Sequence, residues 1–390
     1  MCQYTSMAVA AKSSEERSLS FSEKELKRYK LVAQFQDLLE SASKGRTLSK
    51  TELDARRTLD VEGYFSLMLF TLFNPVIDSM RGACAASTLE SVEQACGSSR
   101  VSLGSFSEAQ SVFDPELLEE VIRTLAADQP ELIADARLGK LSNDIKLFDG
   151  SLIPALPRMA WALWQDDNNR AAKLHLKQSL GTGAVEGVVM TIGNGNEREA
   201  ALKMLKAGDL GVFDRGYAAK YGFINEVTER GASLVARIRN NPIYEVVTTH
   251  VLDEDARQAG VISDEDVLLG QNKIAVRMVV VKVADKCLVL VTDRKNLSAD
   301  LIALIYRYRW QVELFFKWIK CILGCRHLLA HSPRGVAIQV YLALIAAMLL
   351  TRITGKRPSK RQMEMLQFYI LGQCSLKELE AVLALKKARK

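Results

Sequence analysis

The hydrophobic and polar positions of the chain change character along its length. Up to about residue 135 the pattern is typical of helices broken by Gly and Ser, whereas from about residue 143 strand patterns and helix patterns are mixed. A block dense in β-branched residues then occupies about 230–295, and helices follow it. This order is typical of an α/β core that carries a β-rich insertion. We therefore predict such a fold, with helical regions at 1–135 and 351–390.

Residues 87–113 predict two short helices joined by a Gly-Ser-Ser turn, with a Ser capping the second helix. A helix-turn-helix unit of this kind can place its second helix in a DNA groove. Two short helices joined by a turn are also a common packing element, so both interpretations stay open. The prediction for residues 1–135 is a helical region that binds DNA ends.

A helix predicted over residues 306–320 carries a narrow polar stripe. At about 100° per residue, one face of this amphipathic helix collects Tyr306, Arg309, Glu313, Lys317 and Lys320. In one interpretation, Glu313 and Lys317 form an i,i+4 pair on a solvated face. In the other, the carboxylate holds a divalent metal ion, and the phenol and cations grip the phosphate oxygens of a phosphodiester.

Two Asp residues stand at predicted strand ends, where ligands of α/β sheets commonly bind. Asp149 lies in LFDGS and Asp214 in VFDRGY, each with a Gly close by that allows backbone or substrate to approach. Taken singly, an Asp beside Gly is most often a turn former. Together with Glu313, they would supply three carboxylates for two divalent metal ions in an in-line displacement at phosphorus. Asp209 is a rival to Asp214, but it would begin the strand rather than end it.

The composition narrows the class of protein. The chain has 390 residues, 48% of them hydrophobic, which is ample for a core. Its net charge of +6 leans toward an anionic partner, and seven scattered Cys suit a reducing cytoplasm. Residues 1–30 lack the apolar run of a signal peptide. The longest apolar run, 336–350, predicts a buried core helix, because it is shorter than a bilayer requires. We expect a cytoplasmic protein without a membrane span.

The spacing Y-x2-R-x3-E-x6-K in this chain resembles the signature of bacterial insertion-sequence transposases of the insertion-sequence family four type. Its four residues are Tyr306, Arg309, Glu313 and Lys320. Those enzymes carry a DDE triad on an RNase H-like core, with a β-rich insertion between the second Asp and the Glu. The DGS sequence at Asp149 and the DRGY sequence at Asp214 are similar to the contexts of their two Asp residues. The resemblance spans roughly 143–350 and implies an RNase H-like DDE catalytic domain there.

The resemblance implies cut-and-paste DNA transposition by metal-dependent strand cleavage and strand transfer. The catalytic and metal-binding residues would be Asp149, Asp214 and Glu313, holding two Mg²⁺ ions that Mn²⁺ can replace. The resemblance carries phosphate contacts to Tyr306, Arg309 and Lys320, and the polar stripe adds Lys317. The implied partners are double-stranded DNA with terminal inverted repeats, target DNA and a second copy in a homodimeric synaptic complex, all at the bacterial nucleoid.

Two other functions stay open. The chain could be a catalytically silent DNA-binding protein derived from such an element, although its complete set of three acids argues against this. It could also be a stand-alone metal-dependent nuclease, which the phosphate-gripping signature and the large β insertion fit less well. The DNA ends recognised, the target preference and the excision intermediate do not follow from the sequence.

Overall fold

The computed structural model describes residues 30–47, 49–74, 76–132, 135–156, 159–162, 164, 169–322, 328–370 and 373–384. The parts of the predicted terminal regions at 1–29 and 385–390 lie outside the described residues. The same holds for residues 323–327, just after the helix with the polar stripe.

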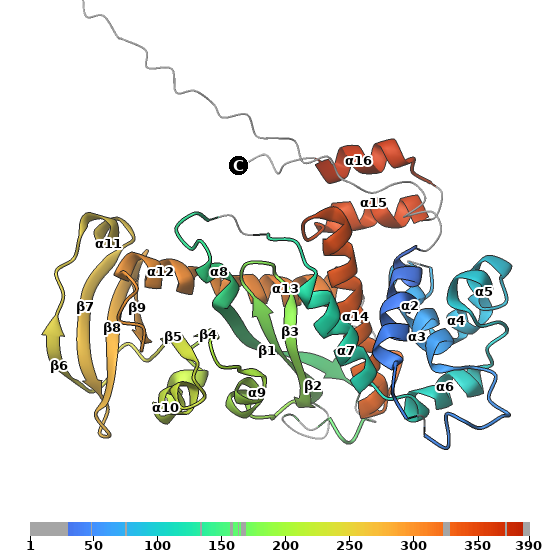
Figure 1. Cartoon of the computed structure of the whole chain (residues 1–390), viewed down its shortest axis with the longest axis horizontal. Coiled ribbons are helices and arrows are strands. Elements are labelled where there is room, and N and C mark those ends of the chain that lie inside the picture. Colours follow the sequence, from blue (N-terminus) through green and yellow to red (C-terminus); the bar gives the residue numbers. More distant parts are fainter. Residues whose placement is uncertain are drawn as a thin grey trace, which may run out of the picture.

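A nine-stranded mixed sheet in the order β3-β2-β1-β4-β5-β9-β8-β7-β6 extends from the middle of the molecule to one of its ends, where β6 and β7 lie (Figure 1). Its first half consists of β1 (Ile145–Ala155), β2 (Arg170–Ser179), β3 (Val185–Ile192), β4 (Leu210–Phe213) and β5 (Ser233–Arg237). The strands β1 to β3 pair antiparallel, while β1, β4 and β5 pair parallel. This is the strand order and direction of an RNase H-like core, so the predicted fold class is confirmed.

The β block after the core does not form a sheet of its own. It consists of β6 (Tyr244–Thr249), β7 (Val261–Leu269), β8 (Ile274–Val283) and β9 (Lys286–Thr292), with the short helix α11 (Glu254–Gln258) between the first two. These strands make an antiparallel meander. Because β9 also pairs antiparallel with β5, the meander extends the core sheet sideways.

Helices cover both faces of the core sheet, because its strands alternate apolar side chains to either side. On one face, α9 (Glu197–Met204) and α10 (Gly222–Thr228) pack on Phe148 and Phe213. The other face carries α7 (Glu116–Ala127), α12 (Ala299–Tyr308), α13 (Trp310–Ile322) and α14 (Pro333–Thr354). The short α8 (Leu141–Asp144) and η1 (Tyr217–Ala219) lead into β1 and follow β4.

The helix predicted over 306–320 is interrupted. Its first part ends α12 and its second part is α13, with Arg309 at the junction. The Arg309 N–H donates to the Tyr306 carbonyl at 3.0 Å, a tighter i to i−3 bond in place of the α-helical one. Arg309 keeps helical backbone angles, so the two helices run on in nearly one line (Figure 1).

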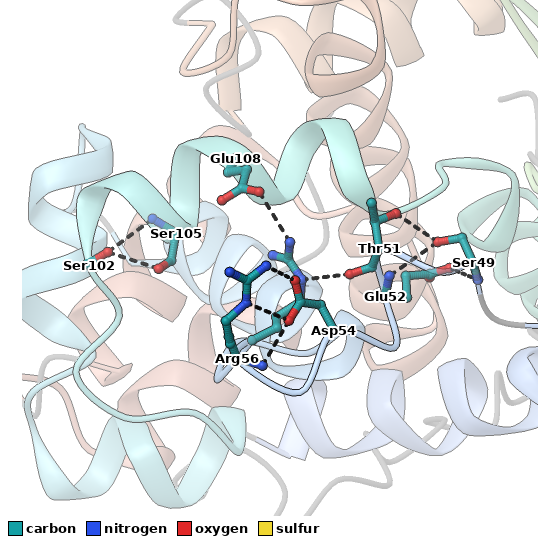
Figure 2. Close-up of polar contacts among 9 residues, drawn as sticks. Ser49, Thr51, Glu52, Asp54, Arg56, Ser102, Ser105 and Glu108 are labelled. Carbon is teal, nitrogen blue, oxygen red and sulfur yellow. Dashed lines mark hydrogen bonds and ion pairs between the residues drawn. The ribbon is translucent and has the colours of Figure 1, made fainter.

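The N-terminal region is helical, as predicted. It contains α2 (Lys30–Ser43), α3 (Val61–Phe73), α4 (Met80–Ala86), α5 (Glu90–Cys96) and α6 (Leu103–Val112). The predicted pair of short helices corresponds to α5 and α6, and the left-handed backbone of Gly97 (φ 74°) ends the first. The Ser102 hydroxyl caps α6 by accepting from the Ser105 N–H at 3.0 Å (Figure 2).

An arginine-containing loop braces α6 from outside. Arg57 lies 3.3 Å from Glu108 of α6, and Arg56 pairs with Asp54 at 2.8 Å on the exposed side of the loop (Figure 2). The ion pair thus ties the loop to the exposed side of α6. This geometry fits a helix that contacts DNA as well as a helix that serves only for packing.

Helix α14 is long and apolar enough to cross a membrane, at 22 residues, but 89% of its most apolar window is buried inside the protein. It contacts α3, α6 and α7 of the N-terminal region as well as α13. This helix is thus the core helix that joins the N-terminal region to the part of the fold that contains the sheet. Two further helices, α15 (Lys360–Ile370) and α16 (Leu376–Ala384), follow it.

Candidate active site

The pairing of β1 with β4 brings the two predicted Asp residues together. The parallel register matches Leu147 with Val212. Two residues further along the chain lie Asp149, still in β1, and Asp214, directly after β4. Because side chains two positions apart point to the same face, both carboxylates emerge at one level on one side of the sheet. The predicted strand end at Asp149 differs from the structure. There, β1 continues to Ala155 because β2 pairs with it over that whole length.

Each of the two Asp side chains is fastened to the backbone that follows it. The Gly150 N–H donates to Asp149 Oδ1, and the Gly216 N–H donates to Asp214 Oδ1, both at 2.8 Å. Each of these bonds occupies one carboxylate oxygen, so the second oxygen can face other groups. This local turn geometry is what the structural interpretation of an Asp near a Gly predicts, and it also orients both carboxylates.

Helix α13 lies over β1 and supplies the third acid together with a cation. Arg309 forms an ion pair with Glu313 one turn further on, and its Nη1 lies 4.0 Å from Asp149 Oδ2. The guanidinium is 12% exposed and stands between the two carboxylates. The i,i+4 partner of Glu313 is therefore Arg309, on its N-terminal side, and not Lys317.

The electrostatics of Asp149 show that the three acids share one environment. Burial raises the pKa of Asp149 to about 7, and the nearby charges of Asp214 and Glu313 push it the same way. The Gly150 N–H and the Arg309 guanidinium oppose this shift. A further cation placed beside such a carboxyl group stabilises its ionised form. The surroundings of Asp149 therefore favour the binding of a cation.

The acids fit a divalent cation in chemistry, because carboxylate oxygens are the ligands that Mg²⁺ prefers. Among the residues that the structure describes, no three acid, His or Cys side chains lie close enough together to form a ready metal cage. Arg309 lies where Asp149 and Glu313 face each other, and it neutralises part of their charge. Closing the three acids around a metal ion therefore requires Arg309 to move.

The other predicted residues divide into two groups. Tyr306 is buried at 8% exposure; burial raises its pKa, and its electrostatic neighbours include Arg309 and Asp214, so it belongs to the site. The Lys320 ammonium instead binds β1, donating to Ser151 Oγ at 2.6 Å and to the Leu152 carbonyl. Lys317 is exposed on the outer side of α13.

A cavity of about 950 Å³ opens beside the site. Tyr306, Arg309 and Trp310 line it from the α12–α13 junction, and residues of α11, β8 and β9 line its other walls. Trp310 is 57% exposed. The β-rich insertion therefore completes a space that begins at two of the predicted phosphate-binding residues.

Comparison with known proteins decides the family. A family model described as the transposase DDE domain matches residues 141–349, which is more than half of the chain. The chain belongs to the transposase DDE domain family. The match starts just before β1 and ends within α14, so it covers Asp149, Asp214 and Glu313. The predicted recognition of a DDE transposase is thereby confirmed.

Curated members of the family are similar over part of their length. A putative transposase, y4zB, of Sinorhizobium fredii is 29% identical over 214 residues, 53% of this chain and 60% of the relative. A putative transposase for insertion sequence element IS4SA of Synechocystis is 25% identical, over 64% of this chain and 71% of the relative. A probable transposase for element IS5377 of Geobacillus stearothermophilus is 27% identical, over 50% and 52%. The chain thus spans about half to seven-tenths of these relatives.

Among solved structures, a piggyBac transposase synaptic complex with hairpin DNA is similar at a TM-score of 0.43. The identity is 10%, and the match covers 94% of this chain and 85% of the other.

One acidic residue beside the site does not stand out in the sequence. Glu197 begins α9, and its side chain lies next to both Gly150 and Gly216. An acid in the first turn of a helix is common, so the sequence offered no signal that would separate it from an ordinary one.

Proposed function

We propose that the chain is a DNA transposase that cleaves and joins the inverted-repeat ends of its own insertion sequence in a metal-dependent reaction. The observation that supports this most directly is the meeting of Asp149, Asp214 and Glu313 from β1, β4 and α13 within one electrostatic environment. Membership of the transposase DDE domain family gives this arrangement its chemical meaning.

In the proposed mechanism, Asp149, Asp214 and Glu313 would hold two Mg²⁺ ions. The metal would supply activation of the attacking oxygen and stabilisation of the leaving oxygen in an in-line displacement at phosphorus. Arg309 and Tyr306 bind phosphate oxygens of the DNA end, since a guanidinium donates to phosphate in a bidentate way. Lys320 holds α13 against β1 and so fixes the height of Glu313 above the two Asp residues.

Arg309 couples DNA binding to metal binding in this proposal. Without DNA, it pairs with Glu313 and lies near Asp149. A DNA phosphate competes for the guanidinium and draws it toward the 950 Å³ cavity that Arg309 also lines. The carboxylates then lose their internal cation, so a divalent metal ion would be bound more tightly when DNA is present than in its absence.

The DNA partners belong to the same proposal. Double-stranded ends with terminal inverted repeats occupy the site, target DNA follows, and two copies of the chain pair the two ends. The braced helix α6, after the turn at Gly97, is the proposed DNA-contacting element of the N-terminal region. The net charge of +6 favours an anionic partner of this kind.

Strand cleavage tests the proposal. The purified chain is incubated with labelled DNA from the flanks of its gene, with Mg²⁺, Mn²⁺ or EDTA, beside Glu313→Gln. The control is Glu226→Gln, the same change at an exposed position of α10. We expect metal-dependent cuts at a defined end by the wild type and the control, and DNA binding without cuts by Glu313→Gln. Cuts by Glu313→Gln would contradict the triad, and binding without cuts by the wild type would favour a silent DNA-binding protein.

A further inference from the structure

The carboxylate of Glu197 lies on the far side of the two glycines that follow the catalytic Asp residues. A Cβ added at Gly150 would stand 3.2 Å from Glu197 Oε1. A Cβ added at Gly216 would stand 3.5 Å from Glu197 Oε2 and 3.1 Å from Asp214 Oδ1. The carboxylates of Glu197 and Asp214 therefore face the same small space, which stays open because residue 216 has no side chain.

The two oxygens of Glu197 have different surroundings. Oε1 is bound by the ammonium of Lys173 on β2 at 2.6 Å. Oε2 is the oxygen that faces Gly216 and Asp214. The lysine thus turns the carboxylate so that its second oxygen points toward the loop after β4, on which the second catalytic Asp stands.

The start of α9 is tied to that same loop. Arg198, the next residue, donates from Nε to the Tyr217 carbonyl at 2.8 Å and from Nη2 to the Gly216 carbonyl at 3.3 Å. The Asn196 side chain caps the helix by accepting from the Arg198 N–H at 3.1 Å. The position of Glu197 relative to Asp214 is therefore set by contacts on both sides.

Tyr217 lies close to the negative charges of these carboxylates. Its side chain is 1% exposed, and burial raises its pKa well above the ordinary value. The charges of Glu197, Asp149 and Asp214 add to this effect. The phenol of Tyr217 thus lies within electrostatic range of Glu197 and of both catalytic Asp residues.

We infer that Glu197 is a fourth acidic residue of the active site, a positioning residue whose Oε2 accepts a hydrogen bond from water bound to the metal at Asp214. This inference rests on the proposed function. An outer carboxylate of this kind orients the water ligands of the metal and adds negative charge that favours cation binding. Lys173 has the matching role of holding Glu197 in place, as the 2.6 Å contact indicates.

Metal binding by the full chain tests the inference without relying on activity. Mn²⁺ is titrated into the wild type, Glu197→Gln and Glu199→Gln, and free Mn²⁺ is followed by electron paramagnetic resonance. Glu199 is the matched control, because it lies in the same helical turn, is exposed, and keeps its bond to Asn196 as a glutamine. We expect Mn²⁺ affinity to fall about 10-fold to 100-fold in Glu197→Gln and to stay unchanged in the control. An affinity within about twofold of wild type would overturn the inference.

Two further variants separate the alternatives. The double variant Lys173→Met/Glu197→Gln removes both charges of the pair. If Glu197 served only to balance the charge of Lys173, its replacement would no longer affect Mn²⁺ affinity in this variant. Recovery of wild-type Mn²⁺ affinity in the double variant would overturn the inference, and continued weak binding would support it. If Glu197→Gln does not fold, Glu197→Asp takes its place. We then expect an intermediate loss of Mn²⁺ affinity, and an unchanged Mn²⁺ affinity would contradict the inference.

The same titration distinguishes this inference from the proposed function. Asp214→Asn should lose Mn²⁺ binding if the acids form a metal site at all. Wild-type binding that is unaffected by Asp214→Asn would refute the metal site itself and the inference with it. Binding that is lost in Asp214→Asn but kept in Glu197→Gln would refute only the role of Glu197.

Discussion

Neutralising Asp149 should stabilise the protein while removing its cleavage activity. The side chain is 17% exposed, and burial raises its pKa from the ordinary 3.8 to about 7. The ionised carboxylate is therefore disfavoured in the folded chain, even with Arg309 nearby. The substitution Asp149→Asn removes the charge and keeps almost the same shape, so the folded state loses this cost.

The sign and the size of the effect follow from linkage between protonation and folding. A carboxyl group whose folded pKa lies above its unfolded pKa costs nothing below about pH 4, and its cost grows as the pH rises from the unfolded pKa to the folded pKa and stays constant above it. A rise in the pKa of Asp149 from 3.8 to about 7 corresponds to about 4 kcal/mol above pH 7. At pH 5.5, below the folded pKa, about 2 kcal/mol of that cost is present. The advantage of Asp149→Asn should therefore roughly double between pH 5.5 and pH 8.5.

Urea unfolding in EDTA at pH 5.5 and pH 8.5, followed by tryptophan fluorescence, measures this difference. Asp37→Asn serves as the control, because Asp37 is exposed on α2 and such changes alter the free energy of unfolding by less than about 0.5 kcal/mol. A variant no more stable than wild type at pH 8.5, or an advantage that does not grow with pH, would refute the reasoning. With Mn²⁺ present, the stability advantage of Asp149→Asn over the wild type should shrink or change sign, because Mn²⁺ stabilises only a chain that binds it.

Four further substitutions test basic residues of the site and of one buried ion pair. Arg309→Ala should lower the salt slope of DNA binding by about 1 and strengthen Mn²⁺ binding in the absence of DNA; anisotropy and Mn²⁺ titrations that both match wild type would speak against the coupling. Lys320→Met should cost about 1–3 kcal/mol of unfolding free energy, because β1 loses a charged donor. Lys317→Met should cost less than about 0.5 kcal/mol yet weaken DNA binding; equal stability losses in the two variants would contradict this contrast. Lys177→Met should cost about 3–5 kcal/mol, because it leaves Asp209, 3.1 Å away and nearly buried, without its cation; urea unfolding with a loss below about 1 kcal/mol would refute the buried pair.

Much of the site could be predicted from local pattern. The strands that lead to Asp149 and Asp214 follow from apolar runs, although the first strand continues past Asp149 to Ala155. The stripe on the later helix follows from a repeat of 3.6 residues. The motif Y-x2-R-x3-E-x6-K then suggested which acid joins them. These features depend only on residues close together in the sequence, because the regular geometry of the backbone decides which of them share a strand or a helix face.

The tertiary structure decided which partner each group takes. Glu313 has a cation four residues away on either side, Arg309 and Lys317, and helical spacing treats the two pairs much alike. The packing of α13 on β1 places Asp149 beside Arg309, so the guanidinium turns inward while Lys317 stays exposed.

Long-range pairing decided the rest. The sequence determined that a β block follows β5 and that acids, glycines and cations recur at particular spacings. It did not determine that β9 would return to pair with β5, or that Glu197 would stand beside Gly150 and Gly216. Those contacts join residues tens of positions apart, and their free energy depends on burial and charge in the assembled core, which no local pattern contains.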